Sequence, residues 1–180
     1  MKILILNGSP RKNGNTATAI QAFVKGISAN HDVTIIRAYD QKITGCLNCN
    51  ACKKNGGRCV VPDGSAEWID QVNHADVIVF ASPVYWWGIS AKAKLALDKF
   101  YSNDEAWHDP SVRKKLAVIA VGADALSGIQ YRLIEDQFKA IAEFLGWDFL
   151  FSKAIQAADI QDLSKNSDML AQLEACGKSL

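Results

Sequence analysis

The sequence predicts an α/β protein built on a doubly wound parallel sheet, with helices on both faces of the sheet. Five apolar, strand-like runs alternate with segments whose apolar residues repeat at helical spacing, and this alternation is typical of parallel sheets. The third and fourth runs are apolar at nearly every position, as expected of strands buried on both faces. No internal repeat, linker or change of composition divides the 180 residues. We therefore expect one three-layer domain over residues 1–180.

The expected strands are short runs of large aliphatic residues that end at polar residues or glycine. They span Lys2–Asn7, Asp32–Ala38, Asp76–Ser82, Lys115–Gly122 and Trp147–Ile155. The helices between them are marked by apolar residues at intervals of three and four. The clearest stripe begins at Ile134, continues through Phe138 and ends before Gly146, a residue common just after a helix. Other helices are expected over residues 17–27, Ala66–His74, residues 89–100 and Ser167–Cys176.

Composition and charge exclude several classes of partner. Hydrophobic residues make up 49% and charged residues 22% of the chain, and the net charge is +1. This charge gives no electrostatic reason to bind nucleic acid or an anionic membrane. No apolar run is long enough to span a bilayer, and Ile3–Leu6 is too short for a signal-peptide core. We expect a cytoplasmic protein.

The first expected strand ends abruptly in a polar loop, residues 7–16, which leads into a helix. Such an arrangement binds anions, because the first N–H groups of a helix have no intrahelical partner. The loop matches neither G-x-x-x-x-G-K-[ST] nor G-x-G-x-x-G, and it suits a terminal phosphate monoester such as that of FMN. An ordinary turn with capping residues is the alternative. The expected phosphate-binding side chains are Ser9, Arg11, Asn13, Asn15 and Thr16.

A second loop, Ala81–Gly88, carries the consecutive aromatic residues Tyr85, Trp86 and Trp87. Exposing so much apolar surface is unfavourable, and a flat flavin ring would cover it by stacking. Ligands of open α/β sheets bind beyond the carboxyl ends of the strands, where this loop should meet the polar loop and Gly122–Gly128. We expect Tyr85 and Trp86 to line the ring and Trp87 to be free for a subunit contact. A subunit interface alone is the alternative.

These motifs, Asn-Gly-Ser-Pro-Arg-x-x-Gly-Asn-Thr and Ala-Ser-Pro-Val-Tyr-Trp with a cysteine loop between them, resemble the flavodoxin-like NADPH-dependent FMN reductase family. Within it, the chain is most similar to members that resemble iron–sulfur flavoproteins. The resemblance covers nearly the whole chain and implies FMN, NAD(P)H as co-substrate, the strand order 2-1-3-4-5 and a homodimer or tetramer. By position it implies phosphate contacts for Ser9, Arg11, Asn15 and Thr16. Ring contacts are implied for Pro83, Val84, Tyr85, Trp86 and Gly88, with Gly122 in a loop that matches less well.

Four of the five cysteines, Cys46, Cys49, Cys52 and Cys59, lie close together in the sequence. Thiolates at this spacing can surround a four-iron cluster, whereas structural zinc sites usually join two separated cysteine pairs. Free thiols are the third alternative, which the long gap before Cys59 and its glycine pair favour over a cluster. Nearby positive charges are expected to lower the pKa values of the thiols, unless these charges are only a solvated surface. They are Lys53, Lys54 and Arg58.

Together these observations favour an oxidoreductase that passes hydride from NAD(P)H to FMN and then reduces a second small-molecule acceptor. No catalytic His, Asp or Ser constellation is present or needed, because the cofactor carries the chemistry. Two other functions stay open. One is an electron carrier with FMN and a four-iron cluster on Cys46, Cys49, Cys52 and Cys59. The other is a flavin-binding protein whose redox state is sensed by a partner.

Overall fold

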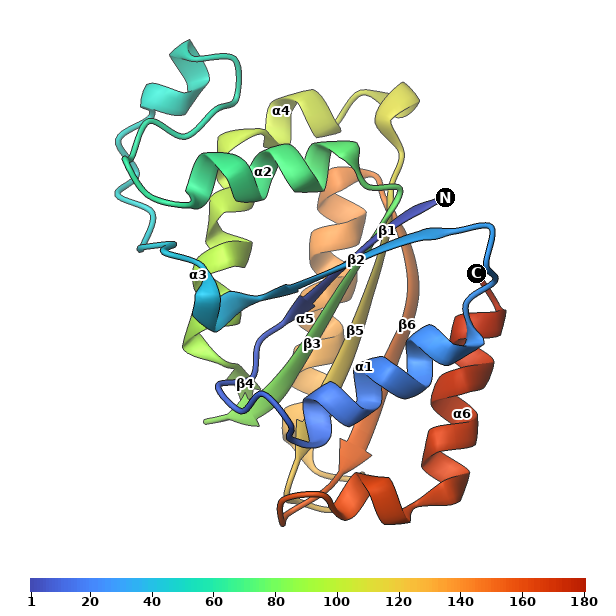
Figure 1. Cartoon of the computed structure of the whole chain (residues 1–180). Coiled ribbons are helices and arrows are strands. Elements are labelled where there is room, and N and C mark those ends of the chain that lie inside the picture. Colours follow the sequence, from blue (N-terminus) through green and yellow to red (C-terminus); the bar gives the residue numbers. More distant parts are fainter.

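The computed structural model describes residues 1–180 and has a central parallel sheet between two layers of helices (Figure 1). Its long strands are β1 (Lys2–Asn7), β2 (Asp32–Arg37), β3 (Val77–Tyr85), β5 (Lys115–Gly122) and β6 (Asp148–Gln156). They lie in the order β2-β1-β3-β5-β6, and every neighbouring pair is parallel. This confirms the predicted fold class, and it is the predicted order 2-1-3-4-5 once the two-residue β4 is set aside.

The sheet has a sixth, short strand that the sequence analysis missed. β3 continues through Pro83 to Tyr85, and the chain then turns back as β4 (Gly88–Ile89), which pairs antiparallel with the end of β3. Trp86 and Trp87 form the turn, with φ angles of +47° and +62°. Two-residue turns of this kind normally use Asn or Gly. The five predicted strands are present, but the short hairpin strand β4 was not predicted, because bulky aromatic residues are not typical of such a turn.

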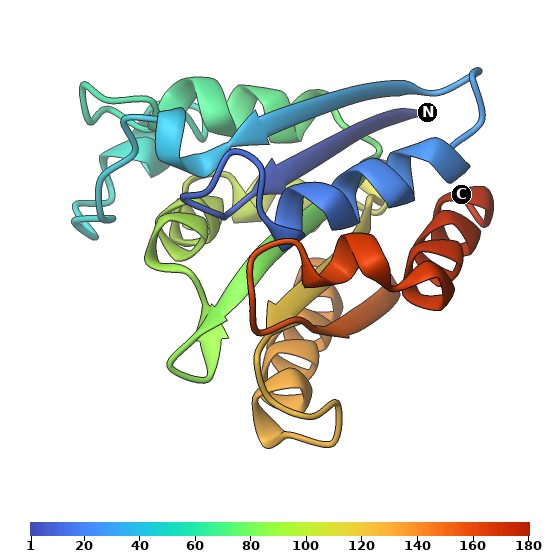
Figure 2. The same cartoon turned by 60° about the horizontal axis from the view of Figure 1, so that its bottom comes forward.

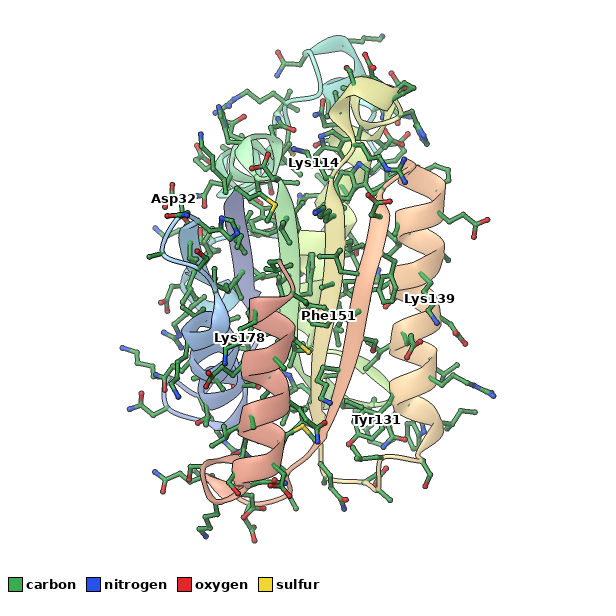
Figure 3. The ribbon with its side chains drawn as sticks, turned by 90° about the vertical axis from the view of Figure 1, so that its right-hand side faces the viewer. Asp32, Lys114, Tyr131, Lys139, Phe151 and Lys178 are labelled. Atoms are coloured by element: carbon green, nitrogen blue, oxygen red, sulfur yellow. The ribbon has the colours of Figure 1, made fainter.

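The helices cover both faces of the sheet. Their bounds are α1 (Asn15–Gly26), α2 (Ser65–His74), α3 (Ala91–Asp98), α4 (Asp104–Trp107), α5 (Ile129–Leu145) and α6 (Ser167–Lys178). Figure 3 shows α1 and α6 toward the left of the picture and α5 at its right, with strands of the sheet between them. The predicted stop at Gly146 is present, with φ of +67°. None of the helices combines the length and apolar character needed to cross a bilayer.

The two faces of the sheet bury separate apolar cores. Alternate residues of β1 point in opposite directions, so Ile3 and Ile5 join the core beneath α1 and α6, whereas Leu4 and Leu6 join the core beneath α2, α3 and α5. In β3, Val79 and Phe80 divide in the same way and are fully buried. Burial on both faces is the physical reason for the continuous apolar runs in the sequence.

Helices α1 and α6 approach each other through two glycines. A Cβ atom on Gly177 would lie 2.1 Å from the carbonyl oxygen of Phe23, and one on Gly26 would lie 1.9 Å from the carbonyl oxygen of Glu174. Both distances are far below van der Waals contact, so the two helix backbones touch directly. This contact helps to hold α1, which begins at the polar loop, in its place on the sheet.

Candidate functional site

Four loops meet at the edge formed by the carboxyl ends of β1, β3, β5 and β6 (Figure 2). They line a cavity of about 240 Å³. Three of these loops were predicted to meet here, and the fourth is the segment after β6 that contributes Ala157 and Ala158. The predicted site residues that line the cavity are Ser9, Arg11, Asn15, Thr16, Pro83, Val84, Tyr85 and Gly122. Asn13, Trp86 and Gly88 do not line this cavity.

One end of the cavity offers hydrogen-bond donors to an anion. Helix α1 begins here with Gly14 as its N-cap, no side chain caps it, and its first turn contains no acidic residue. Its first N–H groups therefore have neither an intrahelical nor a side-chain partner. Thr16 lines the cavity with only 3% of its surface exposed, and its hydroxyl makes no hydrogen bond within the chain. The guanidinium of Arg11 also lines the cavity and is paired with no carboxylate. The alternative of an ordinary capped turn does not describe this helix end.

Ser9 and Asn15 already make hydrogen bonds within the chain. Ser9 Oγ accepts from the N–H of Arg11 at 3.2 Å, which leaves its own O–H free to donate. Asn15 Nδ2 donates to the carbonyl oxygen of Asp159 at 2.8 Å, and Asn15 Oδ1 accepts from the N–H of Leu163 at 3.2 Å. Asn15 thus anchors the loop after β6 against α1. This role depends on residues far apart in the sequence, and no local pattern could reveal it.

A serine network joins the polar loop to the aromatic hairpin. Ser90 Oγ donates to the carbonyl oxygen of Gly8 at 2.6 Å and accepts from the N–H of Ala93, and the N–H of Ser90 donates to Ser82 Oγ at 2.9 Å. A Cβ atom on Gly8 would lie 2.9 Å from Ala93 Cβ, so only glycine permits this approach. Ser90 was not among the predicted site residues, although a serine just before a helical stripe is an N-cap signal.

Replacing Ser90 with alanine should destabilise the protein by about 1–2 kcal/mol, because it removes the cap of α3 and leaves the buried carbonyl of Gly8 without this donor. The measurement is urea unfolding of Ser90→Ala beside the wild type. Ser179→Ala, which removes an exposed hydroxyl at the end of α6, is the control and should change stability by less than about 0.5 kcal/mol. Equal effects of the two variants would contradict the anchoring role.

The aromatic residues divide between two adjoining cavities. Tyr85 lines the cavity described above, whereas Trp86 and Trp87 line a second cavity of about 290 Å³. The two cavities share Val84, Gly122 and Ala123 as walls. Trp86 is 91% exposed at the tip of the hairpin. Tyr85 thus lies in the same cavity as the start of α1, and both tryptophans lie in the adjoining one.

All four clustered cysteines line a third cavity, between their loop and the segment after α3. Figure 1 shows this loop, in cyan and teal, on the far side of α3 from the hairpin. Lys99 and Ser102 also line the cavity. Lys99 is 2% exposed and has one polar contact, 3.4 Å to the carbonyl oxygen of Gly45, and Ser102 Oγ is buried without a partner. No three Cys, His, Asp or Glu side chains are close enough together to hold a metal ion.

Two of the three positive charges near the thiols have carboxylate partners. Lys53 pairs with Asp104 and Glu105, and Arg58 pairs with Asp70. Burial of Cys52 raises the pKa of its thiol, and the opposing charge of Lys53 is too weak to reverse this. The prediction of a lowered thiol pKa was therefore wrong for Cys52, because the sequence does not show that this thiol is buried.

One aspartate holds the two ends of the cysteine loop together. Asp63 accepts hydrogen bonds from the N–H and hydroxyl of Thr44 and from the N–H of Ser65. Partial burial would raise the pKa of Asp63, but the bonds from Ser65 and Thr44 prevail and lower it to about 2. The loop is therefore anchored at its base, and the cysteines lie on its free part.

Comparisons with known proteins agree with this geometry. A model of the NADPH-dependent FMN reductase family matches residues 1–146. A Bacillus subtilis protein named as an NAD(P)H-dependent FMN-containing oxidoreductase is 30% identical over 154 residues, which are 83% of this chain and 81% of that protein. An iron–sulfur flavoprotein of Methanocaldococcus jannaschii is 33% identical over 100 residues. That match covers 55% of this chain and 51% of the relative, so the chain spans about half the length of this relative.

Solved structures share the fold at low sequence identity. An NAD(P)H:quinone oxidoreductase from Methanothermobacter marburgensis superposes with a TM-score of 0.76 at 16% identity, over 99% of this chain and 95% of the other. An FMN-dependent NADH-azoreductase from Bacillus anthracis, solved in complex with FMN, has a TM-score of 0.66 at 15% identity and 99% coverage of both chains. The family match over most of the chain, together with the uncapped helix end and the aromatic hairpin on one sheet edge, shows that this protein belongs to the NADPH-dependent FMN reductase family.

Proposed function

We propose that this protein is an FMN-dependent oxidoreductase that oxidises NAD(P)H and reduces a second small-molecule acceptor. One observation carries the proposal: the donor-rich start of α1 and the aromatic hairpin open onto the same sheet edge. A phosphate monoester at the first and a flat ring at the second are the two ends of FMN. The chain belongs to a family with this chemistry, which supports the same conclusion.

Each wall of the cavity would have a simple task. Arg11, the hydroxyls of Ser9 and Thr16, and the first N–H groups of α1 would bind the phosphate. Pro83, Val84, Tyr85 and Gly122 would hold the ring, with one of its faces left open. FMN, when bound, accepts hydride from NAD(P)H and passes the electrons on. Because the cofactor carries this chemistry, the chain needs no proton-transferring side chain for the hydride step.

FMN, and not FAD, should be released when the purified protein is denatured, because the polar loop offers one compact phosphate site at the start of a single helix. Chromatography of the released flavin against FMN and FAD standards makes the measurement. FAD as the main chromophore would contradict the proposed phosphate site.

We also propose a homodimer or tetramer. Ile129 and Leu133 on α5 are 51% and 45% exposed, close to the exposed hairpin, and apolar surface of this kind is often covered in subunit interfaces. The cytoplasmic location expected from the sequence stays a prediction, and it fits a protein with several clustered thiols.

The cysteine cavity supports a second candidate function, an electron carrier with FMN and an iron–sulfur cluster. Four cysteines line one cavity, and the buried Lys99 and the Ser102 hydroxyl in its wall would be hydrogen-bond donors for cluster sulfurs. Several relatives are named iron–sulfur flavoproteins. The thiols would first have to move together, since their present arrangement is not a metal site. Because this movement would be required, the arrangement of the thiols favours the FMN-dependent oxidoreductase over the electron carrier.

Changing all four clustered cysteines to serine should leave FMN binding intact, because the proposed FMN site lies on other loops. Lys99 follows α3 by one residue and Ala91 begins it, so about 12 Å of helix separates the cysteine cavity from the hairpin. The measurements are flavin content of the variant, and iron and sulfide content of wild-type protein purified without oxygen. About four iron atoms per wild-type chain would favour the electron carrier.

A further inference from the structure

The second cavity at the sheet edge combines two tryptophan rings with one carboxylate. It is lined by Trp86, Trp87, Asp124 and Gln130, in addition to the three residues that it shares with the proposed FMN cavity. We call these four residues the Trp–Asp wall. Because the two cavities share walls, a molecule in the second one lies directly beside the proposed position of the flavin ring.

The tryptophans are held outward by a costly backbone conformation. Trp86 and Trp87 both have positive φ angles, which bulky residues adopt at a cost of about 1–3 kcal/mol each. Their ring centroids are 5.9 Å apart with an interplanar angle of 47°. Trp87 remains 52% exposed, so packing in the core offsets neither the backbone strain nor the exposure of the two rings. A ligand that stacks on these rings would account for both.

Asp124 is the only charged side chain that lines this cavity. Its Oδ2 accepts from Gln130 Nε2 at 2.8 Å, and Gln130 is itself 4% exposed. The hydroxyl of Tyr131, also buried, donates to the backbone carbonyl of Asp124 at 3.0 Å. Gln130 thus positions the carboxylate and Tyr131 the backbone of the same residue, while Asp124 itself stays accessible to solvent.

We propose that the Trp–Asp wall is the electron-acceptor subsite and that it selects planar aromatic cations. Tryptophan faces attract cations and stack on flat rings, and an ordered carboxylate adds charge attraction that no lining cation opposes. The inference rests on the proposed function, in which NAD(P)H supplies the hydride. A cationic dye such as methylene blue takes up two electrons and one proton and becomes neutral. The attraction to Asp124 is then lost, which would aid release of the product.

The test compares two dyes of opposite charge on the FMN-loaded protein. Methylene blue is the cationic probe, and 2,6-dichlorophenolindophenol, an anion at neutral pH, is its counterpart. Equilibrium dissociation constants are measured for the oxidised protein, and kcat/KM is measured for each dye with NAD(P)H. Asp124→Asn keeps the shape of the side chain and its bond to Gln130 but removes the charge. Asp136→Asn, on the exposed surface of α5, makes the same change in net charge elsewhere.

Asp124→Asn should weaken methylene blue binding about fivefold, the effect of one ion pair at about 4 Å in water, and should leave the anionic dye unchanged or bound slightly more tightly. Trp87→Leu should weaken both dyes, and Asp136→Asn should change neither by more than about twofold. Equal effects of Asp124→Asn on the two dyes, or none, would overturn the proposal. Flavin content and NAD(P)H oxidation are recorded for every variant. A wild-type protein that holds no flavin and does not oxidise NAD(P)H would refute the proposed function. A wild-type protein that does both but binds the two dyes without the expected effect of Asp124→Asn would refute only the subsite.

Discussion

Arg11→Ala should weaken FMN binding roughly tenfold to 150-fold, which corresponds to about 1.5–3 kcal/mol, the contribution of hydrogen bonds to a charged group. The guanidinium lines the cavity and pairs with no carboxylate. A phosphate would therefore be the first ionic partner of the guanidinium. In the alanine variant, only the start of α1 and the hydroxyls would remain to bind the phosphate. The measurement is a titration of apo-protein with FMN, followed by the quenching of flavin fluorescence.

The neighbouring residue provides a matched control for this prediction. Lys12 carries the same charge on the same loop, is exposed, and does not line the cavity. Lys12→Ala should change the FMN dissociation constant by less than about threefold, the scale of a long-range, screened interaction. If Arg11→Ala and Lys12→Ala have the same effect, the guanidinium acts only through the general field of the loop and does not contact the phosphate.

Gly177→Ala should lower the free energy of unfolding by about 3 kcal/mol, at the upper end of overpacking effects. The new methyl group would lie 2.1 Å from the carbonyl oxygen of Phe23, and backbone cannot rotate out of its way as a side chain can. Helices α1 and α6 would have to separate. For a chain of this size, the melting temperature should fall by about 6–12 °C. Thermal and urea unfolding measure both quantities.

This variant should also affect the site, because α1 begins at the polar loop. A displaced α1 would move Thr16 and the bonds of Asn15 to the loop after β6, so FMN binding should weaken as well. Ala175→Ser, on the exposed face of α6, adds an atom without touching α1 and should alter neither property. Wild-type stability in Gly177→Ala would show that the two helices can shift apart at little cost.

The parts of the fold that were predicted well are those with a strong local pattern. The strand Lys115–Gly122 was predicted with its observed bounds, because burial on both faces requires an apolar residue at nearly every position. The end of α5 at Gly146 followed from the need for a left-handed residue there. Likewise, the polar loop before α1 was recognisable because anion binding at a helix start uses residues that are consecutive in the sequence.

The parts that were missed depend on contacts between distant segments. The hairpin turn at Trp86 and Trp87 uses residues that are unfavourable in such turns. The turn preferences of these residues therefore did not predict the hairpin. Ser90 matters because it reaches Gly8, and Asn15 matters because it reaches Asp159 and Leu163. The burial of Cys52, which raises the pKa of its thiol, likewise depends on segments that the sequence does not show to be in contact.

The amino-acid sequence by itself determined the alternation of the five long strands with helices, which depends on local periodicity, and the family, which depends on motifs of consecutive residues. The anion site over residues 7–16 is predicted from consecutive residues in the same way. Only the tertiary structure decided which residues share a cavity: Tyr85 with the start of α1, both tryptophans with Asp124, and the four clustered cysteines with the buried Lys99. The physical reason is that these relations arise when the sheet aligns the ends of its strands, and that alignment is a property of the whole packed chain.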